Sequence, residues 1–192
     1  GIIIARYVPD ESLEGKNLEE IAESMGTTPA EAALRIYEKS EAMVVSYGMT
    51  DEDVETFAAH PLIAVASDGE SLSTEGVLSA GKPHPRSYGT NPRFLQKFVN
   101  EKKLVSIQEA VRKMTSMPAQ RLGLTNRGRL TPGYAADIVI MDLPNVEEKA
   151  TFVDPHQYSK GITHVIVNGE IVIKDEEFTG KTPGKMITDF NS

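Results

Sequence analysis

Apolar segments of strand length alternate with predicted helices through the first third of the sequence. These segments lie at residues 2–8, 42–47 and 62–66, and the last of them, LIAVA, contains no polar residue. A strand that is apolar along its whole length is typical of a sheet buried on both faces, and strands that alternate with helices are typical of parallel βαβ units. The pattern therefore predicts an α/β fold, and it leaves a doubly wound sheet and a (β/α)8 barrel both open.

Local end signals predict the helices between these segments. Asn17 followed by Glu20 fits a capping box for a helix that ends at Gly26. Thr28 with Pro29 is typical of the start of a second helix. The packed face of this second helix is expected at Ala33, Leu34 and Tyr37. Further helices are expected at residues 51–60, 91–101 and 106–117, and the last of them begins with a second capping box at Ser106 and Glu109. A turn is expected at residues 119–122.

The sequence becomes β-rich after Gly128. Apolar runs lie at residues 135–141 and 164–173, and the second run contains Asn-Gly at residues 168–169. Asn-Gly is the dipeptide favoured in two-residue hairpin turns. We therefore expect a small antiparallel β unit at the end of the chain.

The composition favours small-molecule chemistry. The formal net charge is −8, so no basic surface is expected to bind nucleic acid or an anionic membrane. The absence of cysteine excludes disulfides, thiolate metal sites and cysteine nucleophiles, and it fits a reducing cytoplasm. We expect a globular cytoplasmic protein with a small-molecule partner, and neither nucleic acid nor a membrane as a partner.

Asp68 directly follows the apolar run at residues 62–66. The carboxyl edge of a parallel sheet is where connecting loops meet and where α/β proteins place their sites. Asp-Gly is also a common turn dipeptide, so the Asp68 side chain could serve only to close a turn. We take Asp68 as the candidate catalytic carboxylate and keep the turn role as the alternative.

The segment after Asp68 is rich in Gly, Pro and Ser, and it contains Lys82, His84, Arg86 and Tyr88. An arginine fork with neighbouring hydrogen-bond donors can hold a carboxylate. A loop of this composition can equally be a plain connection between two elements. Arg86 is the preferred carboxylate anchor, with His84 behind it.

The other histidines do not show a metal-binding spacing. His60 precedes a proline at a helix end and His164 begins a strand, so both are expected to be structural. His156 has polar neighbours in Asp154 and Tyr158, and its role stays open. Because no two-histidine metal motif occurs, a complete metal site is not expected within this chain.

Several motifs together resemble the C-terminal signature of the amidohydrolase superfamily. EAVRKMTSMPA at residues 109–119 and PGYAADIV at residues 132–139 carry this resemblance. SDG at residues 67–69, HPRSYGT at residues 84–90 and ATFVDPH at residues 150–156 are similar to the N-acyl-D-amino-acid deacylase (D-aminoacylase) branch. The resemblance covers nearly the whole chain.

The resemblance implies a metal-bearing (β/α)8 TIM-type barrel joined to a small β-sandwich domain. Residues 1–127 would be the last βα units of the barrel, and residues 128–192 part of the sandwich. It also implies that Asp68 takes a proton from a zinc-bound water and passes it to the leaving amine, and Asp68 is a possible zinc ligand as well. The residues expected near the substrate, an N-acyl-D-amino acid, are Ser67, Gly69, His84, Arg86 and Tyr88.

The resemblance also predicts a missing part. The family draws a His-x-His pair and other metal ligands from earlier barrel strands, and the chain, which begins at Gly1 without Met, has no match for them. We therefore expect a C-terminal piece of a longer enzyme, whose partner is the N-terminal part and which alone neither binds zinc tightly nor hydrolyses the substrate. Unpaired strand edges of an open partial barrel predict self-association.

Two other functions stay open. One is another amidohydrolase that acts on a cyclic amide, similar to a dihydropyrimidinase or a dihydroorotase. The other is a non-catalytic assembly module, in which the β-rich tail mediates oligomer contacts and Asp68 only closes a turn.

Overall fold

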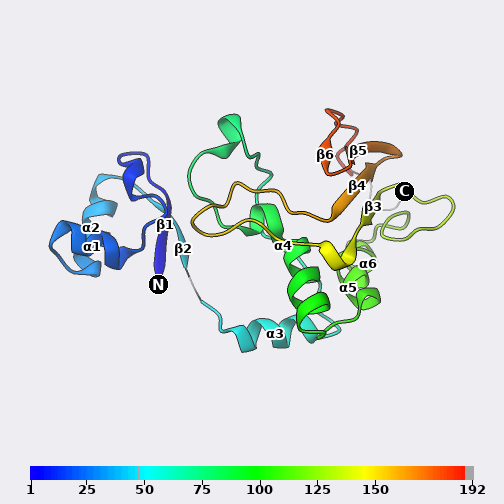
Figure 1. The fold of residues 1–192 in the computed structure, drawn as a ribbon, viewed down its shortest axis with the longest axis horizontal. Helices are drawn as coiled ribbons and strands as arrows, with labels where there is room; N and C mark the ends of the chain where they lie inside the picture. The colour runs from blue at the N-terminus through cyan, green and yellow to red at the C-terminus, as the bar shows by residue number, and fades with distance from the viewer. Residues whose placement is uncertain (47, 189–192) are drawn as a thin grey trace. The chain divides into compact units, whose positions relative to one another are not determined.

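The described part of the chain falls into two structural units. The structure is a computed structural model, and it describes residues 1–46 and 48–188. Unit 1 comprises residues 1–50, 68–89 and 149–158, and unit 2 comprises residues 51–67, 90–148 and 159 onward (Figure 1). The assignment of residues 1–127 to a barrel and of residues 128–192 to a sandwich stays a prediction.

Unit 1 contains a two-stranded antiparallel sheet in which Ile3 pairs with Val45. Its elements include β1 (Ile2–Arg6), η1 (Glu11–Leu13), α1 (Leu18–Met25), α2 (Pro29–Lys39), β2 (Met43–Ser46) and η2 (Gly76–Ser79). The expectation of parallel pairing was wrong for β1 and β2. A single helix between two strands lets both strands run in the same direction, whereas the two helices α1 and α2 reverse the chain once more and make the strands antiparallel. Tyr47, the last residue of the predicted second strand, lies outside the described residues.

The first two helices begin and end at the predicted signals. Asn17 Oδ1 accepts a hydrogen bond from Glu20 N at 2.8 Å, and Glu20 Oε2 accepts one from Asn17 N at 2.9 Å, which completes the capping box. Gly26 ends α1 in the left-handed conformation, with φ of 62°. Thr28 caps α2 and Pro29 is its first residue. These ends are set by neighbours in the sequence, which is why the pattern finds them.

The packed face of α2 differs from the prediction. Ala32 and Ile36 are buried in the core of unit 1, together with residues of α1 and β1. Leu34 is 59% exposed and Tyr37 is 70% exposed, so the face predicted from Ala33, Leu34 and Tyr37 was wrong. The helix carries apolar residues on two sides, and only the packing against its neighbours selects between them.

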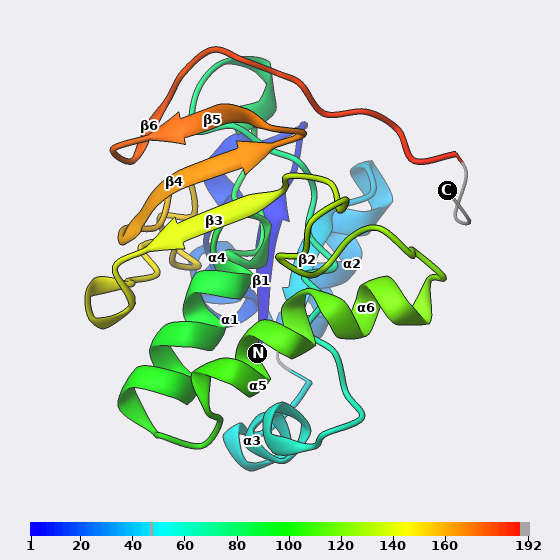
Figure 2. The ribbon, with the colours of Figure 1, turned by 90° about the vertical axis from the view of Figure 1, so that its right-hand side faces the viewer.

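Unit 2 combines helices with an antiparallel sheet in the order β3-β4-β5-β6. Its elements are α3 (Asp51–Ala59), the later part of α4 (Arg86–Phe94), the π-helix η3 (Leu95–Glu101), α5 (Ile107–Met114), α6 (Ser116–Arg121), β3 (Ile138–Met141), η4 (Leu143–Asn145), β4 (Ile162–Val167), β5 (Glu170–Lys174) and β6 (Glu177–Phe178). Figure 2 shows the four strands side by side, with β3 nearest to the helices. Phe94, Phe98 and Ala110 lie in the core of this unit.

The hairpin predicted at residues 168–169 is confirmed. β4 and β5 pair antiparallel on either side of this turn. Asn168 has φ of 49° and Gly169 has φ of 81°, and two successive positive values are what a type I′ hairpin turn requires. Asn168 N also donates to Asp137 Oδ1 at 2.8 Å, which ties the turn to the residue before β3.

The apolar run at residues 62–66 does not form a strand, so that prediction was wrong. Val65 N donates to the backbone oxygen of Lys113 at 3.2 Å. The Lys113 ammonium donates to the carbonyl of His60 and, at 3.0 Å, to that of Ile63. An apolar pattern predicts burial, whereas a strand also needs a neighbouring strand, and within the described chain this segment is held by α5 instead.

The later helices depart from the prediction at their ends. α4 begins at Arg86, upstream of its predicted start, because the Nδ1 atom of His84 accepts a hydrogen bond from Arg86 N at 3.0 Å. Ser106 caps α5 by accepting from Glu109 N at 3.2 Å, but the Glu109 carboxylate binds Arg112 at 2.7 Å instead of closing the capping box. α6 includes residues 119–121 of the segment that was expected to be a turn at residues 119–122.

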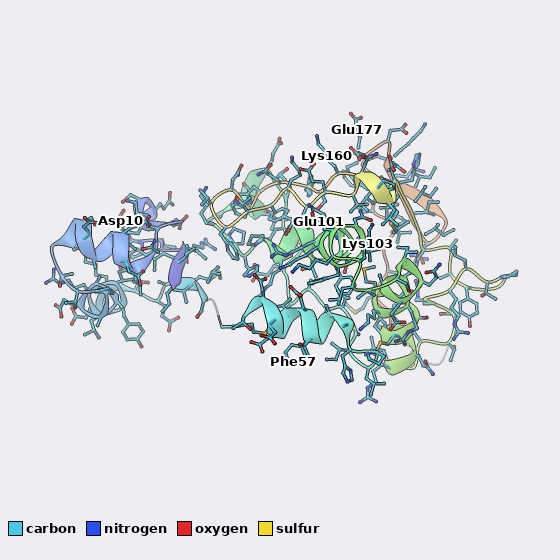
Figure 3. All side chains as sticks on the ribbon, turned by 60° about the horizontal axis from the view of Figure 1, so that its bottom comes forward. Asp10, Phe57, Glu101, Lys103, Lys160 and Glu177 are labelled. Carbon is cyan, nitrogen blue, oxygen red and sulfur yellow. The ribbon has the colours of Figure 1, made fainter. Side chains whose placement is uncertain are left out.

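Many charged side chains are exposed in each unit, whereas Lys113 is buried. Asp10 of unit 1 and Glu101 and Lys160 of unit 2 illustrate this in Figure 3. Among the helices of the described residues, none has the length and apolar character needed to cross a lipid bilayer.

Candidate active site

Asp68 follows the apolar run at residues 62–66, and it has a positive φ of 50°. This left-handed conformation strains most L-residues, and aspartate and asparagine tolerate it best after glycine. The Asp68 side chain is 85% exposed. The turn role and an accessible carboxylate are therefore both present at this residue.

Arg86, the first residue of α4, forms an ion pair with Asp68. Its Nη2 atom lies 2.9 Å from Asp68 Oδ2, and the Arg86 side chain is 43% exposed. An ion pair this open to water contributes roughly 0–1 kcal/mol, so a ligand that offers a better-placed carboxylate can displace it. The pair thus places an exchangeable cation beside an accessible carboxylate.

Gly69 brings the chain after Asp68 directly onto the first turn of α4. A Cβ atom on Gly69 would lie 2.9 Å from Ser87 Cα and 3.0 Å from the backbone oxygen of Arg86. Glu70 N donates to Ser87 Oγ at 3.2 Å and fixes the same approach. Only a residue without a side chain fits here, which gives Gly69 a packing role in the site.

His84 acts as a helix cap in this structure. Its Nδ1 atom accepts from Arg86 N, and its ring meets Phe152 edge to face with the ring centroids 4.9 Å apart. Lys82 lies just upstream, and its ammonium donates to the backbone oxygen of Val153 at 2.8 Å. Both side chains therefore hold the segment at residues 149–158 against the start of α4.

Tyr88 and His156 meet in unit 1 although they lie far apart in the sequence. Tyr88 Oη lies 2.7 Å from the backbone oxygen of Ser73 and 2.8 Å from His156 Nδ1. His156 Nε2 lies 2.8 Å from the backbone oxygen of Gly81. Burial raises the pKa of Tyr88, and the nearby Tyr158 hydroxyl raises that pKa further, so the Tyr88 phenol keeps its proton at neutral pH.

The structure brings together only part of the predicted site. Asp68, Gly69 and Arg86 lie in contact, whereas His84 and Tyr88 bind backbone and other side chains of unit 1. The expected roles of Ser67, Gly69, His84, Arg86 and Tyr88 in binding substrate stay predictions. The Tyr88–His156 contact had no signal in the sequence beyond the polar neighbours of His156.

The two histidines expected to be structural make contacts of that kind. His60 Nδ1 accepts from Leu62 N at 3.3 Å. His164 lies in β4 and pairs with Lys174 of β5. Neither contact involves a residue of the candidate site.

The described residues do not form a complete metal site. Within residues 1–46 and 48–188, no three His, Asp or Glu side chains are placed to share one ion. Asp68 is the carboxylate available at the candidate site, and its neighbour there is a cation. This donor set does not fit a zinc ion by itself, because zinc sites use at least three protein ligands.

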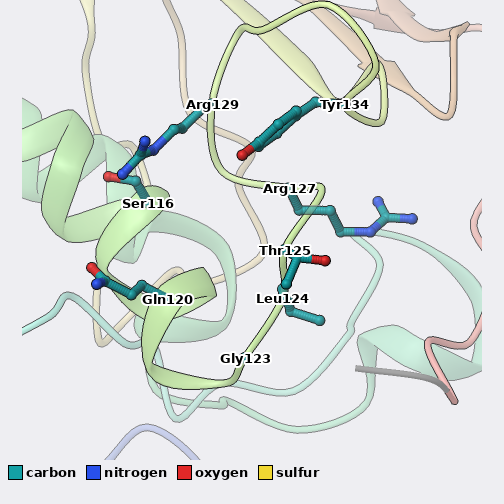
Figure 4. Close-up of a pocket in the computed structure, with 8 residues that line it drawn as sticks. All are labelled: Ser116, Gln120, Gly123, Leu124, Thr125, Arg127, Arg129 and Tyr134. Atoms are coloured by element: carbon teal, nitrogen blue, oxygen red, sulfur yellow. The ribbon is translucent and has the colours of Figure 1, made fainter. Parts of the chain in front are cut away.

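A separate hollow in unit 2 lacks the groups for acid–base catalysis. Its volume is about 280 Å³, and Figure 4 shows the side chains that line it. Its lining has no carboxylate and no histidine; the residues are Ser116, Gln120, Gly123, Leu124, Thr125, Arg127, Arg129 and Tyr134. Among the described residues, the candidate site therefore rests on Asp68 and its neighbours.

Comparison with known sequences identifies relatives of the chain. A model of an amidohydrolase family matches residues 79–173. An N-acyl-D-aspartate deacylase of Alcaligenes xylosoxydans xylosoxydans is 36% identical over 90% of this chain and 33% of its own length. A dihydroorotase of Pyrococcus horikoshii is 28% identical over 80% of this chain and 39% of its own length. The chain thus spans about a third of the length of these curated relatives.

Solved structures give the same result. A crystal structure of a D-aminoacylase matches 94% of this chain with a TM-score of 0.82 and 34% identity, and the match covers 36% of that protein. An N-acyl-D-glutamate deacylase from Bordetella bronchiseptica matches 89% of this chain and 34% of its own, with a TM-score of 0.79 and 34% identity. That deacylase was crystallised with zinc and a phosphonate that mimics the tetrahedral intermediate of its reaction.

Proposed function

Because this chain belongs to the amidohydrolase family and matches about a third of an N-acyl-D-amino-acid deacylase, we propose that it is the C-terminal part of an enzyme that hydrolyses the amide bond of N-acyl-D-amino acids. The observation that carries the proposal is the accessible Asp68 carboxylate beside Arg86. The pairing supplies a proton acceptor and a carboxylate anchor, the two groups that the substrate requires from this part of the enzyme.

Asp68 is the general acid and base of the proposed reaction. Its carboxylate takes a proton from the attacking water as the water oxygen bonds to the amide carbon. The same proton then goes to the amide nitrogen as the carbon–nitrogen bond breaks, which releases a carboxylic acid and a D-amino acid. Proton transfer by one positioned group contributes typically about 10²–10⁴-fold to such rates.

Arg86 is the proposed anchor for the α-carboxylate of the substrate. A guanidinium binds a carboxylate through two parallel hydrogen bonds. When the substrate carboxylate replaces Asp68 on Arg86, the Asp68 carboxylate is released from the ion pair to meet the attacking water.

Zinc is the proposed cofactor of the complete enzyme, since a related deacylase binds it. A bound zinc ion makes water more acidic, so that a carboxylate is a sufficient base at neutral pH. Apart from Asp68, the ligands are expected to come from the N-terminal part. We expect the 192-residue chain alone to bind zinc weakly and to lack turnover.

The barrel and sandwich assignments belong to the same proposal. The strands β3 and β5 carry half-exposed apolar side chains, among them Val139 at 51% and Ile171 at 40% exposure, which supports further strands from another part of the enzyme as their cover. Leu62 of unit 2 is likewise 79% exposed. We expect the isolated chain to self-associate through such surfaces. The absence of cysteine favours the cytoplasm.

A substrate panel tests the proposed function. The 192-residue chain and a longer gene product that contains it are assayed for zinc content and for hydrolysis of N-acetyl-D-amino acids, N-acetyl-L-amino acids and dihydroorotate. We expect D-specific hydrolysis by the longer protein only. Preferred hydrolysis of the cyclic amide would support the dihydroorotase-like alternative, and inactivity of both zinc-loaded forms would support an assembly module. Stoichiometric zinc and turnover in the short chain would contradict its expected dependence on the missing part.

A further inference from the structure

The hollow in unit 2 is lined by hydrogen-bonding side chains that the rest of the described chain leaves unused. Four of them, drawn in Figure 4, are Ser116, Gln120, Arg129 and Tyr134. Across residues 1–46 and 48–188, these four side chains make neither a hydrogen bond nor an ion pair. Polar groups that converge on one hollow and have no protein partner can serve to bind and orient a ligand.

Gly128 brings the loop that carries Arg129 directly onto the start of α6. A Cβ atom on Gly128 would lie 2.9 Å from Ser116 Cα and 3.0 Å from the backbone oxygen of Thr115, and the φ of 80° also favours glycine. Ser116 and Gln120 are four residues apart in α6, so they lie on the same face of that helix. The hollow therefore arises from a close contact between this loop and one face of α6.

The loop at residues 127–134 is fastened at its base. Ala135 N donates to the backbone oxygen of Asn126 at 2.9 Å. Next to this bond, the Arg127 guanidinium forms an ion pair with Asp137. Two fastenings at the same place restrict the loop before any ligand arrives, which lowers the entropy cost of binding one.

The hollow offers a ligand one positive charge. The charge of Arg127 is compensated by Asp137, which also accepts a hydrogen bond from Asn168 N at 2.8 Å. The lining contains no carboxylate, so the Arg129 guanidinium is the charge that a ligand meets. A guanidinium with hydroxyl and amide donors beside it suits a carboxylate, and a single charge favours a monoanion over a phosphate dianion.

A second, mostly apolar hollow shares Arg129 and Tyr134 with the first. Its volume is about 230 Å³, and its lining includes Leu130, Pro132 and Ile138. Ligand sites in proteins typically combine an apolar lining with a few polar groups that fix the orientation of the ligand. A ligand whose carboxylate binds Arg129 can therefore lay an apolar group on this second lining.

We propose that the two hollows form one binding site for a small organic monocarboxylate with an apolar body. Arg129 binds the carboxylate, Tyr134 donates a hydrogen bond to it, and Leu130 contacts the apolar body. The site shares no residue with the Asp68 and Arg86 pair, and it does not depend on the proposed function.

Titration of the 192-residue chain with hexanoate, followed by amide NMR, tests this site. We expect hexanoate to shift amide signals within residues 116–138, with a Kd in the millimolar range that is ordinary for a ligand of this size. Arg129→Gln should weaken binding by about ten-fold or more, because it removes a charge-assisted hydrogen bond. Arg121→Gln changes an exposed arginine at the end of α6 that does not line the hollow, so it should keep the wild-type Kd. The same spectra show whether each variant is folded.

Three other ligands separate the two parts of the site. Hexanol lacks the charge, whereas acetate and inorganic phosphate lack the apolar body, and each should bind at least about ten-fold more weakly than hexanoate. Equal binding of hexanoate by the wild type and Arg129→Gln, or binding of any of these three ligands as tight as that of hexanoate, would overturn the proposal.

A longer gene product that contains this chain provides the last comparison. The shifts caused by hexanoate should persist there, with the same dependence on Arg129. Their loss would show that another part of the enzyme covers the hollow, and it would overturn the assignment of the hollow as a ligand site. Neither result depends on whether the longer protein hydrolyses an N-acyl-D-amino acid.

Discussion

The Asp68 carboxylate and the Arg86 guanidinium lie 2.9 Å apart, and both remain open to solvent. A buried pair of this kind would be locked in place, because separating it would leave a charge in a low-dielectric interior. An open pair can exchange partners at little cost. Arg86 therefore orients the Asp68 carboxylate and leaves it accessible to a substrate.

Asp68→Asn separates the catalytic role of this residue from its role in the turn. Asparagine tolerates the positive φ of 50°, so we expect the free energy of unfolding to change little, while turnover of the active form falls by about 10²–10⁴-fold. The measurements are kcat and urea unfolding. Asp10→Asn is the matched control, since Asp10 accepts from Ser12 N at 3.1 Å in a turn of unit 1. Near-normal turnover in Asp68→Asn would end the catalytic assignment.

Gly69→Ala tests the close approach of the loop to α4. The new Cβ would lie 2.9 Å from Ser87 Cα, so backbone must shift, and we expect a loss of about 1–3 kcal/mol in the free energy of unfolding. Gly48→Ala is the control in the same unit, because a Cβ at Gly48 has nothing within 4 Å. The two variants are compared by chemical denaturation, and equal stabilities would contradict the packing role of Gly69.

Helix ends and the hairpin turn could be predicted because their causes are local. The capping box of Asn17 and Glu20 and the turn at residues 168–169 depend on residues within a few positions of one another. The same holds for Asp68, whose place after an apolar run is visible in the sequence. The sequence also indicated Arg86 as a carboxylate anchor, but it did not predict that Arg86 pairs with Asp68.

The pairing of strands that are distant in the sequence, and other long-range contacts, could not be predicted, because they depend on which elements meet. The run at residues 62–66 looks like a buried strand, yet in the described chain its contacts come from Lys113 of α5. Ile3 pairs antiparallel with Val45 because two helices, not one, separate their strands. The contact between Tyr88 and His156 joins residues that are 68 positions apart, so only the fold reveals it.

Lys113→Met tests the buried lysine that holds the segment before Asp68. The Lys113 side chain is fully buried and donates to the carbonyls of His60 and Ile63. Methionine keeps the bulk and leaves both carbonyls without that donor, so we expect a loss of about 2–4 kcal/mol in the free energy of unfolding. Lys160→Met, at an exposed position, should change it by less than about 0.5 kcal/mol.

The pH dependence of this stability has a definite sign. Burial lowers the pKa of Lys113 in the folded state. At pH values between this lowered pKa and the ordinary pKa of lysine, the unfolded chain therefore binds more protons than the folded chain. The wild-type chain should therefore gain stability as pH rises through this alkaline window, and Lys113→Met should lack that gain. Urea unfolding at a series of alkaline pH values checks both statements, and parallel curves for the two proteins would contradict them.

Glu148 gives a pH dependence of the opposite sign in unit 2. Its carboxylate is 10% exposed and lies 3.0 Å from Arg93 Nη1, and burial raises its pKa although Arg93 opposes the shift. Just above the ordinary pKa of a glutamate, the folded chain then holds a proton that the unfolded chain has released. The contribution of Glu148 to stability therefore falls as pH rises through that window.

Glu148→Gln should remove this pH-dependent loss. The Arg93 side chain is 52% exposed, so water solvates its charge when the partner is neutral, and we expect little or no loss of stability at pH 7. Arg93→Met leaves the buried carboxylate unpaired, and we expect a loss of about 1–3 kcal/mol at pH 7 that shrinks as the solution is acidified and Glu148 takes up its proton. Urea unfolding of the three proteins between about pH 4 and pH 7 measures these differences. A loss at pH 7 that is larger for Glu148→Gln than for Arg93→Met would show that attraction within the pair outweighs the desolvation of Glu148, contrary to the direction of its pKa shift.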